Sequence, residues 1–247
     1  SKDELALQRL ASILNERFKW LPSRIPIALE KRTIDLDFFQ YLLRHTFWRP
    51  RDILFLAGRV ISAAEYYRSR NLEFDSNTLK LIVSRSLTAI INTEFIKEFN
   101  GTIENIEYVI RRFEDANQMM SFEDFFARLN GVKLARAQSS EADRYGNGLS
   151  DQEHILRLLY NIGFVGFYLK SKSLAARRFE TPWVFIFNEG DSILTMQSDV
   201  SRKEIQLVIH PIFIEYLGLS PYRDVLVCEF DQDYLVRQEA HQVASVG

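Results

Sequence analysis

The spacing of apolar residues changes at Gly163, and this change constrains the fold more than any other feature of the 247-residue sequence. Before Gly163, apolar residues recur every three or four positions, as they do along one face of an α-helix. After it, they form short aromatic and β-branched runs at 164–169, 183–187 and 205–209, which are typical of β-strands. The sequence therefore predicts a mainly α protein whose C-terminal part contains a small antiparallel β-sheet.

Residues that begin or end helices mark the boundaries in the N-terminal part. Pro50 suits the first position of a helix, because the backbone N–H that it lacks would be unpaired there. Asn100 and Gly101 suit a helix end, since both tolerate the left-handed backbone found there. With the apolar spacing, these residues predict helices over 5–20, 35–47, 50–67, 77–99 and 103–116.

Further capping patterns organise the rest of the chain. A short capped helix is predicted over 121–130, and a second helix over 150–162 begins with a capping box and ends at Gly163. The small, polar and aperiodic stretch 137–148 between them predicts a linker or long loop. A short helix over 211–217 and one more strand over 223–230 complete the prediction.

The order of these elements predicts two domains and a tail. Two helices, then a helix that ends at a glycine, then a strand and a β-hairpin is the order found in a winged helix-turn-helix domain. We expect a helical domain over 1–118, a winged helix-turn-helix domain with a small antiparallel β-sheet over 119–235, and a flexible tail over 236–247.

Composition narrows the class of protein. The net charge of −2 does not favour nucleic acid or an anionic membrane over other partners. Cys228 is the single cysteine, so an internal disulfide framework is excluded and a cytoplasmic location is expected. No apolar run approaches the roughly 20 residues needed to cross a bilayer, so no membrane partner is expected. The chain begins at Ser1, which suits a piece of a longer protein.

No complete catalytic centre is predicted in this chain. The phosphate-binding loop with its Gly-Lys-Ser/Thr ending is absent, as are the usual zinc-protease, serine-hydrolase and dinucleotide-binding signatures. The histidines lack the i+3 or i+4 partner of a helical metal site, so we expect structural roles and no metal. They are His45, His154, His210 and His241.

The stretch Arg49-Pro50-Arg51-Asp52 is the strongest candidate for a binding site. Two guanidinium groups flank a proline at the start of a helix, where they could hold a phosphate or carboxylate through paired hydrogen bonds. The alternative is a structural role, with Arg49 paired to an acidic neighbour such as Asp35 or Asp37.

A second candidate is a basic run between the first strand and the hairpin. It consists of Lys170, Lys172, Arg177 and Arg178. Such residues in a wing could contact nucleic-acid phosphates and supply salt-sensitive affinity. The helix that would enter the DNA groove begins with Asp151 and Glu153, however, so duplex recognition is disfavoured.

Three stretches resemble a known family. They are 41–52, which contains Arg49-Pro50-Arg51, the helix end 94–99, and 158–166 taken with 208–211. In this order they resemble the region that follows the nucleotide-binding core in a family of bacterial P-loop ATPases. That family is related to AAA+ and STAND proteins and is often associated with anti-phage defence. The resemblance covers roughly residues 30–220.

The resemblance implies a regulatory role for this chain. The helical domain would correspond to the lid of the ATPase, in which Arg49 and Arg51 sense the terminal phosphate of the nucleotide. Arg51 is slightly preferred because it opens the lid helix. The winged helix would relay the nucleotide state to an effector or to neighbouring subunits of a homo-oligomer. Because this chain lacks the phosphate-binding loop, ATP would be held by an upstream or partner domain.

Two other hypotheses remain open. A stand-alone winged-helix DNA-binding protein with a helical dimerisation half would use the basic run on its wing. A hydrolase with an unrecognised site has only scattered carboxylates in its favour.

Overall fold

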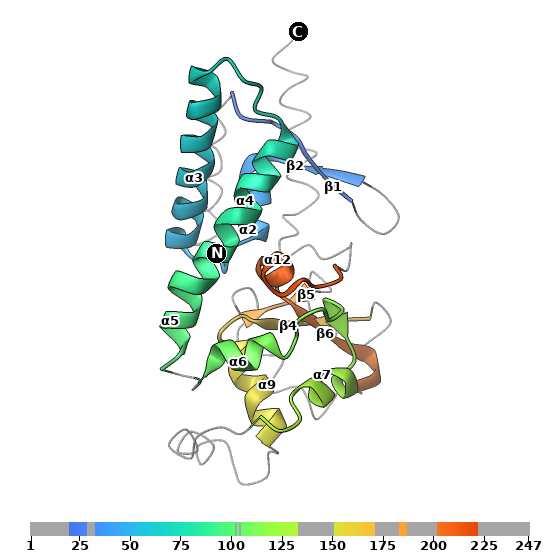
Figure 1. Cartoon of the computed structure of the whole chain (residues 1–247). Helices are drawn as coiled ribbons and strands as arrows, with labels where there is room; N and C mark the ends of the chain where they lie inside the picture. The colour runs from blue at the N-terminus through green and yellow to red at the C-terminus, as the bar shows by residue number, and fades with distance from the viewer. Residues whose placement is uncertain are drawn as a thin grey trace.

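A computed structural model of the chain describes residues 20–28, 33–101, 103, 105–132, 151–170, 183–186 and 202–221. It is mainly helical with a small antiparallel sheet in its C-terminal part, as the apolar spacing predicts, and it has a second antiparallel sheet near the N-terminus that was not predicted. One sheet accompanies a group of long helices, and the other lies among shorter helices at the opposite end of the molecule (Figure 1). The predicted helix 5–20, loop 137–148, strand 223–230 and tail 236–247 lie outside the described residues.

The N-terminal described segment is a β-hairpin followed by a short helix. Strand β1 (Ile25–Ala28) pairs antiparallel with β2 (Thr33–Leu36), and helix α2 spans Phe38–Arg44. Asp37 caps α2, accepting a hydrogen bond of 2.8 Å from the Gln40 backbone N–H. The predicted helix 35–47 was therefore wrong at both ends, because its first residues pair with β1 and its last form a turn.

Two long helices follow and pack against each other. Helix α3 (Pro50–Ser69) begins at Pro50 as predicted. Helix α4 (Ser76–Ile90) continues through a π-helical turn (Ile91–Phe95) into α5 (Ile96–Phe99), so the predicted long helix is confirmed with a wide turn inside it. Helix α6 (Ile106–Arg111) is shorter than predicted, since Asn105 before it has a left-handed backbone and turns follow it.

The second sheet gathers strands from distant parts of the chain. Its order is β3 (Met119–Met120), β6 (Ile205–Ile209), β4 (Val165–Leu169) and β5 (Trp183–Val184), with antiparallel neighbours throughout. The other elements of this part are helices α7 (Phe122–Arg128), α9 (Asp151–Asn161) and α12 (Ile214–Leu217), with 3-10 turns over Arg202–Glu204 and Pro211–Phe213.

Gly163 ends helix α9 in a left-handed conformation, with φ of +80°. The Phe164 N–H donates to the Leu159 carbonyl at 3.0 Å, and the Gly163 N–H donates to the Tyr160 carbonyl at 2.9 Å. This pair of bonds is the Schellman motif, which satisfies carbonyls left unpaired at a helix end. The predicted stop at Gly163 is therefore confirmed.

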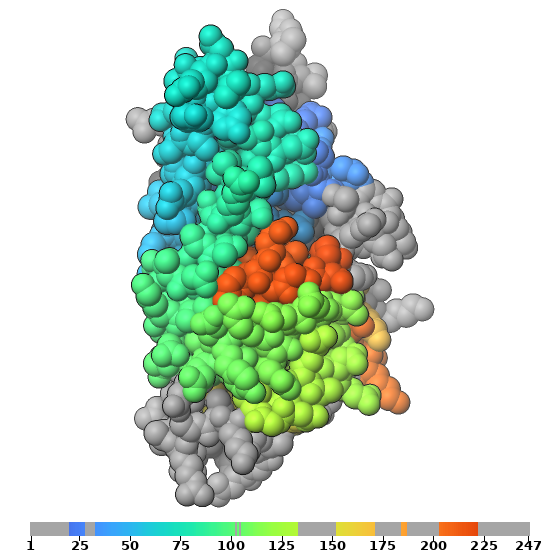
Figure 2. All heavy atoms as spheres, viewed as in Figure 1, coloured from blue at the N-terminus to red at the C-terminus, as the bar shows by residue number. Residues whose placement is uncertain are grey.

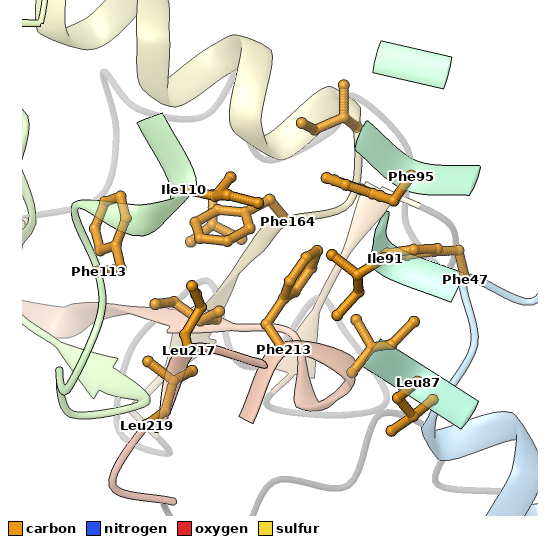
Figure 3. Close-up of a cluster of buried hydrophobic side chains, with 14 of the residues drawn as sticks. Phe47, Leu87, Ile91, Phe95, Ile110, Phe113, Phe164, Phe213, Leu217 and Leu219 are labelled. Atoms are coloured by element: carbon orange, nitrogen blue, oxygen red, sulfur yellow. The ribbon is translucent and has the colours of Figure 1, made fainter. Parts of the chain in front are cut away.

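The buried side chains form one cluster that extends across both predicted domains. Phe113, which follows α6, packs on Phe125 and Phe164, with ring centroids 4.7 and 5.4 Å apart. Phe213 contacts Phe95 of the π-helical turn and Phe164 of the sheet region (Figure 3). In Figure 2 the orange segment that contains α12 lies between the cyan long helices and the green segment with α6 and α7. The two parts therefore share a continuous apolar interior.

None of the described helices is long and apolar enough to span a membrane.

Candidate functional site

The turn between α2 and α3 is held in an unusual backbone conformation. Trp48 has a φ of +58°, which is uncommon for a bulky side chain and is found where surrounding structure enforces it. Thr46 supports the turn, because its hydroxyl donates to the Leu43 carbonyl at 3.1 Å and accepts from the Trp48 N–H at 3.3 Å. The strained residue immediately precedes Arg49, so the turn sets the direction of that side chain.

Arg49 makes a two-point contact with Glu98 of α5. Its Nη1 atom lies 2.8 Å from both Oε1 and Oε2 of the carboxylate. The guanidinium carbon also lies 5.6 Å from the ring centroid of Phe47 and 5.3 Å from that of Phe99. Such cation–π contacts attract the guanidinium group and restrict its position. Glu98, rather than Asp35 or Asp37, is therefore the partner of Arg49.

Arg51 converges on the same carboxylate from the first turn of α3. Its Nη2 lies 3.0 Å from Glu98 Oε2, and its Nη1 lies 3.5 Å from Glu94 Oε2. The hydrogen bond to Glu98 raises the pKa of Arg51 above its ordinary value. The structure thus brings the two predicted sensing arginines together around the carboxylate of Glu98, which lies 47 residues after Arg51 in the chain. We call the place where Arg49 and Arg51 meet Glu98 the corner.

Asp52 is a third carboxylate at this corner and is buried, with 4% of its side chain exposed. Burial raises its pKa above the ordinary value, while the charges of Arg49 and Arg51 act in the opposite direction. With Glu94 and Glu98, Asp52 gives the corner three carboxylates for two guanidinium groups. The arginines are therefore fully neutralised by groups of the chain itself.

Phe47 inserts from this turn into the interior shared by the two parts of the molecule (Figure 3). Its ring stacks on Phe95 at a centroid distance of 5.4 Å and lies 4.9 Å from the imidazole of His210. It also approaches Gly163 so closely that a β-carbon there would lie 2.9 Å from Cδ1 of Phe47. The residues beside Arg49 are thus in direct contact with the end of α9 and the end of β6.

Two buried histidines lie near this contact. Burial lowers the pKa of His210 to about 3, and the nearby Arg44 charge acts in the same direction. Burial also holds the pKa of His45 well below its usual value. The Nδ1 atom of His210 accepts a hydrogen bond of 3.2 Å from the Ile212 N–H. Both imidazoles are therefore neutral at pH 7.

The second predicted site lies largely outside the described residues. Lys172, Arg177 and Arg178 fall there, whereas Lys170 is exposed and its Nζ donates to the Lys203 carbonyl at 2.7 Å. On α9, Gln152 donates to the Phe126 carbonyl and to Asn130 Oδ1, and no side chain over 152–160 is exposed. Helix α9 is therefore packed against its neighbours over these positions.

Sequence reasoning missed Glu98 as the partner of the arginines and Phe47 as the contact with the C-terminal part. The i, i+4 spacing of Phe95 with Phe99 and of Glu94 with Glu98 marks two adjacent faces of one helix, one apolar and one acidic. That spacing could have suggested a surface able to receive both an aromatic ring and a cation. The spacing alone does not identify the cationic side chain that binds to this surface.

Two guanidinium groups point at one carboxylate, whose oxygens accept hydrogen bonds as phosphate oxygens do. Within the described residues, no group of three or more histidine, cysteine or acidic side chains is arranged to hold a metal ion. Comparisons with protein-family models, with curated proteins and with solved structures found no match for this chain.

Proposed function

We propose that this chain is the lid and winged-helix regulatory module of a bacterial P-loop ATPase, acting in the cytoplasm and in anti-phage defence. In this proposal Arg49 and Arg51 sense the terminal phosphate of ATP held by a P-loop domain upstream or on a partner. The observation that carries the proposal is the convergence of both guanidinium groups on Glu98, at 2.8 and 3.0 Å. Arginine side chains placed in this way bind phosphate oxygens as readily as carboxylate oxygens.

The position of the arginines at the first turn of α3 supports a sensing role. Arg49 precedes the helix and Arg51 is its second residue, so both are held by a rigid 20-residue helix. Their side chains are 35% and 57% exposed, which leaves them accessible to a group on another domain. The N-terminus of α3 adds a partial positive charge that favours an incoming anion.

The order of elements around the second sheet supports the winged-helix part of the proposal. The segment runs through α6, β3, α7, α9, β4 and β6, and β6 lies between β3 and β4. A helix, a strand, two helices and two further antiparallel strands in this order are characteristic of winged helices, although residues 170–204, which include β5, separate β4 from β6 here. The addition of β5 beside β4 is a departure from the smallest form of that domain.

Phe47 offers a route by which phosphate binding would reach this domain. It lies two residues before Arg49 and contacts His210 and Phe95. A change in the position of Arg49 would move the turn that carries Phe47, and a packed interior transmits such shifts because it contains little free space. The winged-helix part would then present a different surface to an effector or to a neighbouring subunit.

Titration of labelled ATP tests the proposal, using this 247-residue chain and the full product of its gene. We expect binding by the form that contains a P-loop domain, and weaker binding when Arg49 or Arg51 is replaced by alanine. Loss of a hydrogen bond to a charged group should weaken binding about 10- to 100-fold. Arg59→Ala, further along α3, is the matched control, since Arg59 contacts the Phe55 ring and lies away from the corner.

Unchanged ATP affinity in both arginine variants would contradict a sensing role. Salt-sensitive binding of duplex DNA without any ATP binding would instead support the DNA-binding alternative. In that case charge reversal at the basic run should abolish binding. That run consists of Lys170, Lys172, Arg177 and Arg178.

A further inference from the structure

Glu98 occupies the two guanidinium groups that the proposed function assigns to phosphate. The Arg49 Nη1 atom lies 2.8 Å from each of its oxygens, and the Arg51 Nη2 atom lies 3.0 Å from Oε2. Glu94 adds a weaker contact to Arg51 at 3.5 Å. An incoming phosphate would need the same hydrogen-bond donors, so the two anions cannot occupy the corner in the same way at once.

We infer that Glu98 is an internal competitor of phosphate, a carboxylate that holds Arg49 and Arg51 in an inactive arrangement until a phosphate chain displaces it. This inference rests on the proposed function and names how the same site is regulated. The ligand class is a di- or triphosphate chain, because its charge exceeds that of one carboxylate and its oxygens can engage both arginines. The exchange is non-covalent and changes only the partner of the two guanidinium groups.

Exposure makes the exchange feasible. The side chains of Arg49 and Glu98 are 35% and 37% exposed, so water can hydrate each group when the pair separates. Ion pairs at such positions are weak, since solvent screens them and both side chains lose freedom when they pair. A fully buried pair would instead leave an uncompensated charge on separation and would resist displacement.

The charges at the corner explain why Glu98 must move. Glu94, Glu98 and Asp52 supply three negative charges against two positive ones, so the unliganded corner is not attractive to an anion. Asp52 is buried in α3 and cannot turn away, whereas Glu98 is on the surface of α5. Departure of Glu98 leaves two negative charges against two positive ones and frees the guanidinium donors that a phosphate needs.

The position of Glu98 connects this exchange to the interior. Glu98 lies in the α-helical turn directly after the π-helical residues 91–95, and Phe95 within them stacks on Phe47. A π-helical turn is wider than an α-helical turn and occurs often at functional sites. Release of Glu98 from Arg49 would free one side of α5 from the turn before α3, next to the Phe47–Phe95 contact.

Titration of sodium tripolyphosphate into the 247-residue chain at low salt, followed by calorimetry, tests the inference. Glu98→Gln removes the competing charge and keeps the size of the side chain. We expect it to bind tripolyphosphate at least about 5-fold more tightly than the unaltered chain, which corresponds to about 1 kcal/mol and matches the upper range for exposed ion pairs. Arg49→Ala combined with Glu98→Gln should lose this gain.

Glu107→Gln is the matched control, because Glu107 accepts a 2.9 Å hydrogen bond from Arg111 on a surface with similar exposure. It changes the net charge by the same amount and should leave the affinity unchanged. Equal affinities for the unaltered chain and Glu98→Gln, both reduced by Arg49→Ala, would refute competition by Glu98 and leave the sensing role intact. Absence of tripolyphosphate binding in every variant would overturn the inference, whereas the sensing role is judged separately by the ATP titration of the form that contains a P-loop domain.

Discussion

The ring of Phe47 lies directly against Gly163, at a separation that leaves no room for a side chain. A β-carbon placed on Gly163 would be 2.9 Å from Cδ1 and 3.2 Å from Cε1 of the ring. Phe47 comes from the turn before α3, and Gly163 ends α9, so the contact joins the helical part to the part with the larger sheet. A larger side chain at Gly163 would clash with the Phe47 ring, and a smaller side chain at Phe47 would leave a cavity there. Both substitutions therefore disturb the same contact.

Gly163→Ala is expected to destabilise the protein by about 2 kcal/mol or more, and Gly163→Val by a larger amount. Two costs add, because the left-handed backbone disfavours a side chain and the new atom would press on the Phe47 ring. Urea unfolding measures the change in the free energy of unfolding. Gly58→Ala is the control, since no atom lies within 4 Å of its β-carbon position, and it should stabilise by about 0.5–1 kcal/mol. Unchanged stability in Gly163→Val would contradict the arrangement at the end of α9.

Phe47→Ala is expected to cost about 3–5 kcal/mol, because Phe47 is 6% exposed and its removal leaves a cavity among aromatic rings. Urea unfolding followed by tryptophan fluorescence measures this loss. Tyr108→Ala serves as the comparison, since Tyr108 is 57% exposed and its removal should change stability by no more than about 0.5 kcal/mol. Similar small losses in both variants would mean that Phe47 is not a packing residue of the interior.

The pair formed by Arg49 and Glu98 should contribute little to stability. A double-mutant cycle with Arg49→Ala and Glu98→Gln is expected to give a coupling energy of about 0.2–1 kcal/mol, falling as salt is added. The reason is that both side chains are about one-third exposed, so water competes for the same hydrogen bonds. A coupling energy well above this range would show that Glu98 is held too firmly to be exchanged for phosphate.

Stability should decrease as the pH falls from 7 to 5. The pKa of His210 is lowered on folding to about 3, so the unfolded chain binds more protons than the folded chain between about pH 3 and 6.5. The free energy of unfolding then falls with pH over this window, by about 2 kcal/mol between pH 7 and pH 5 for this histidine. The lowered pKa of His45 acts in the same direction.

Urea midpoints measured at pH 7, 6 and 5 check this dependence. His210→Asn should have a shallower slope, because its amide does not titrate and its oxygen can still accept from the Ile212 N–H. Its stability at pH 7 is expected to be lower, so the slope and not the absolute value is compared. An unchanged slope in this variant would show that His210 is not the titrating group.

Local signals in the sequence were enough to place several elements. Pro50 begins α3, Ser121 caps α7 through the Asp124 N–H, and Gly163 ends α9 with its predicted left-handed backbone. Each of these features depends on hydrogen bonds within about five residues, so the residues that create it are neighbours in the sequence. The mainly helical class with an antiparallel sheet follows from the apolar spacing for the same reason.

Other features depend on which distant segments meet. The hairpin of β1 and β2 was missed because residues 35 and 36 were assigned to the predicted helix 35–47, whereas pairing across the sheet decided their structure. The π-helical turn at 91–95 leaves no distinct pattern in the residues, since the apolar spacing around it also fits an ordinary helix.

The sequence by itself therefore determined the start of α3, the cap of α7 and the end of α9, the mainly helical class, and the two arginines at the start of α3. Only the tertiary structure decided that Glu98 is their partner and that Phe47 meets Gly163. Both contacts join residues that are far apart in the chain, and they form only once α4 and α5 have folded back beside α3 and α9 has packed beneath the corner. A helix cap is a hydrogen bond between residues close in the sequence. Which distant residues come into contact, such as Glu98 with Arg49, depends instead on how the whole chain buries its apolar surface.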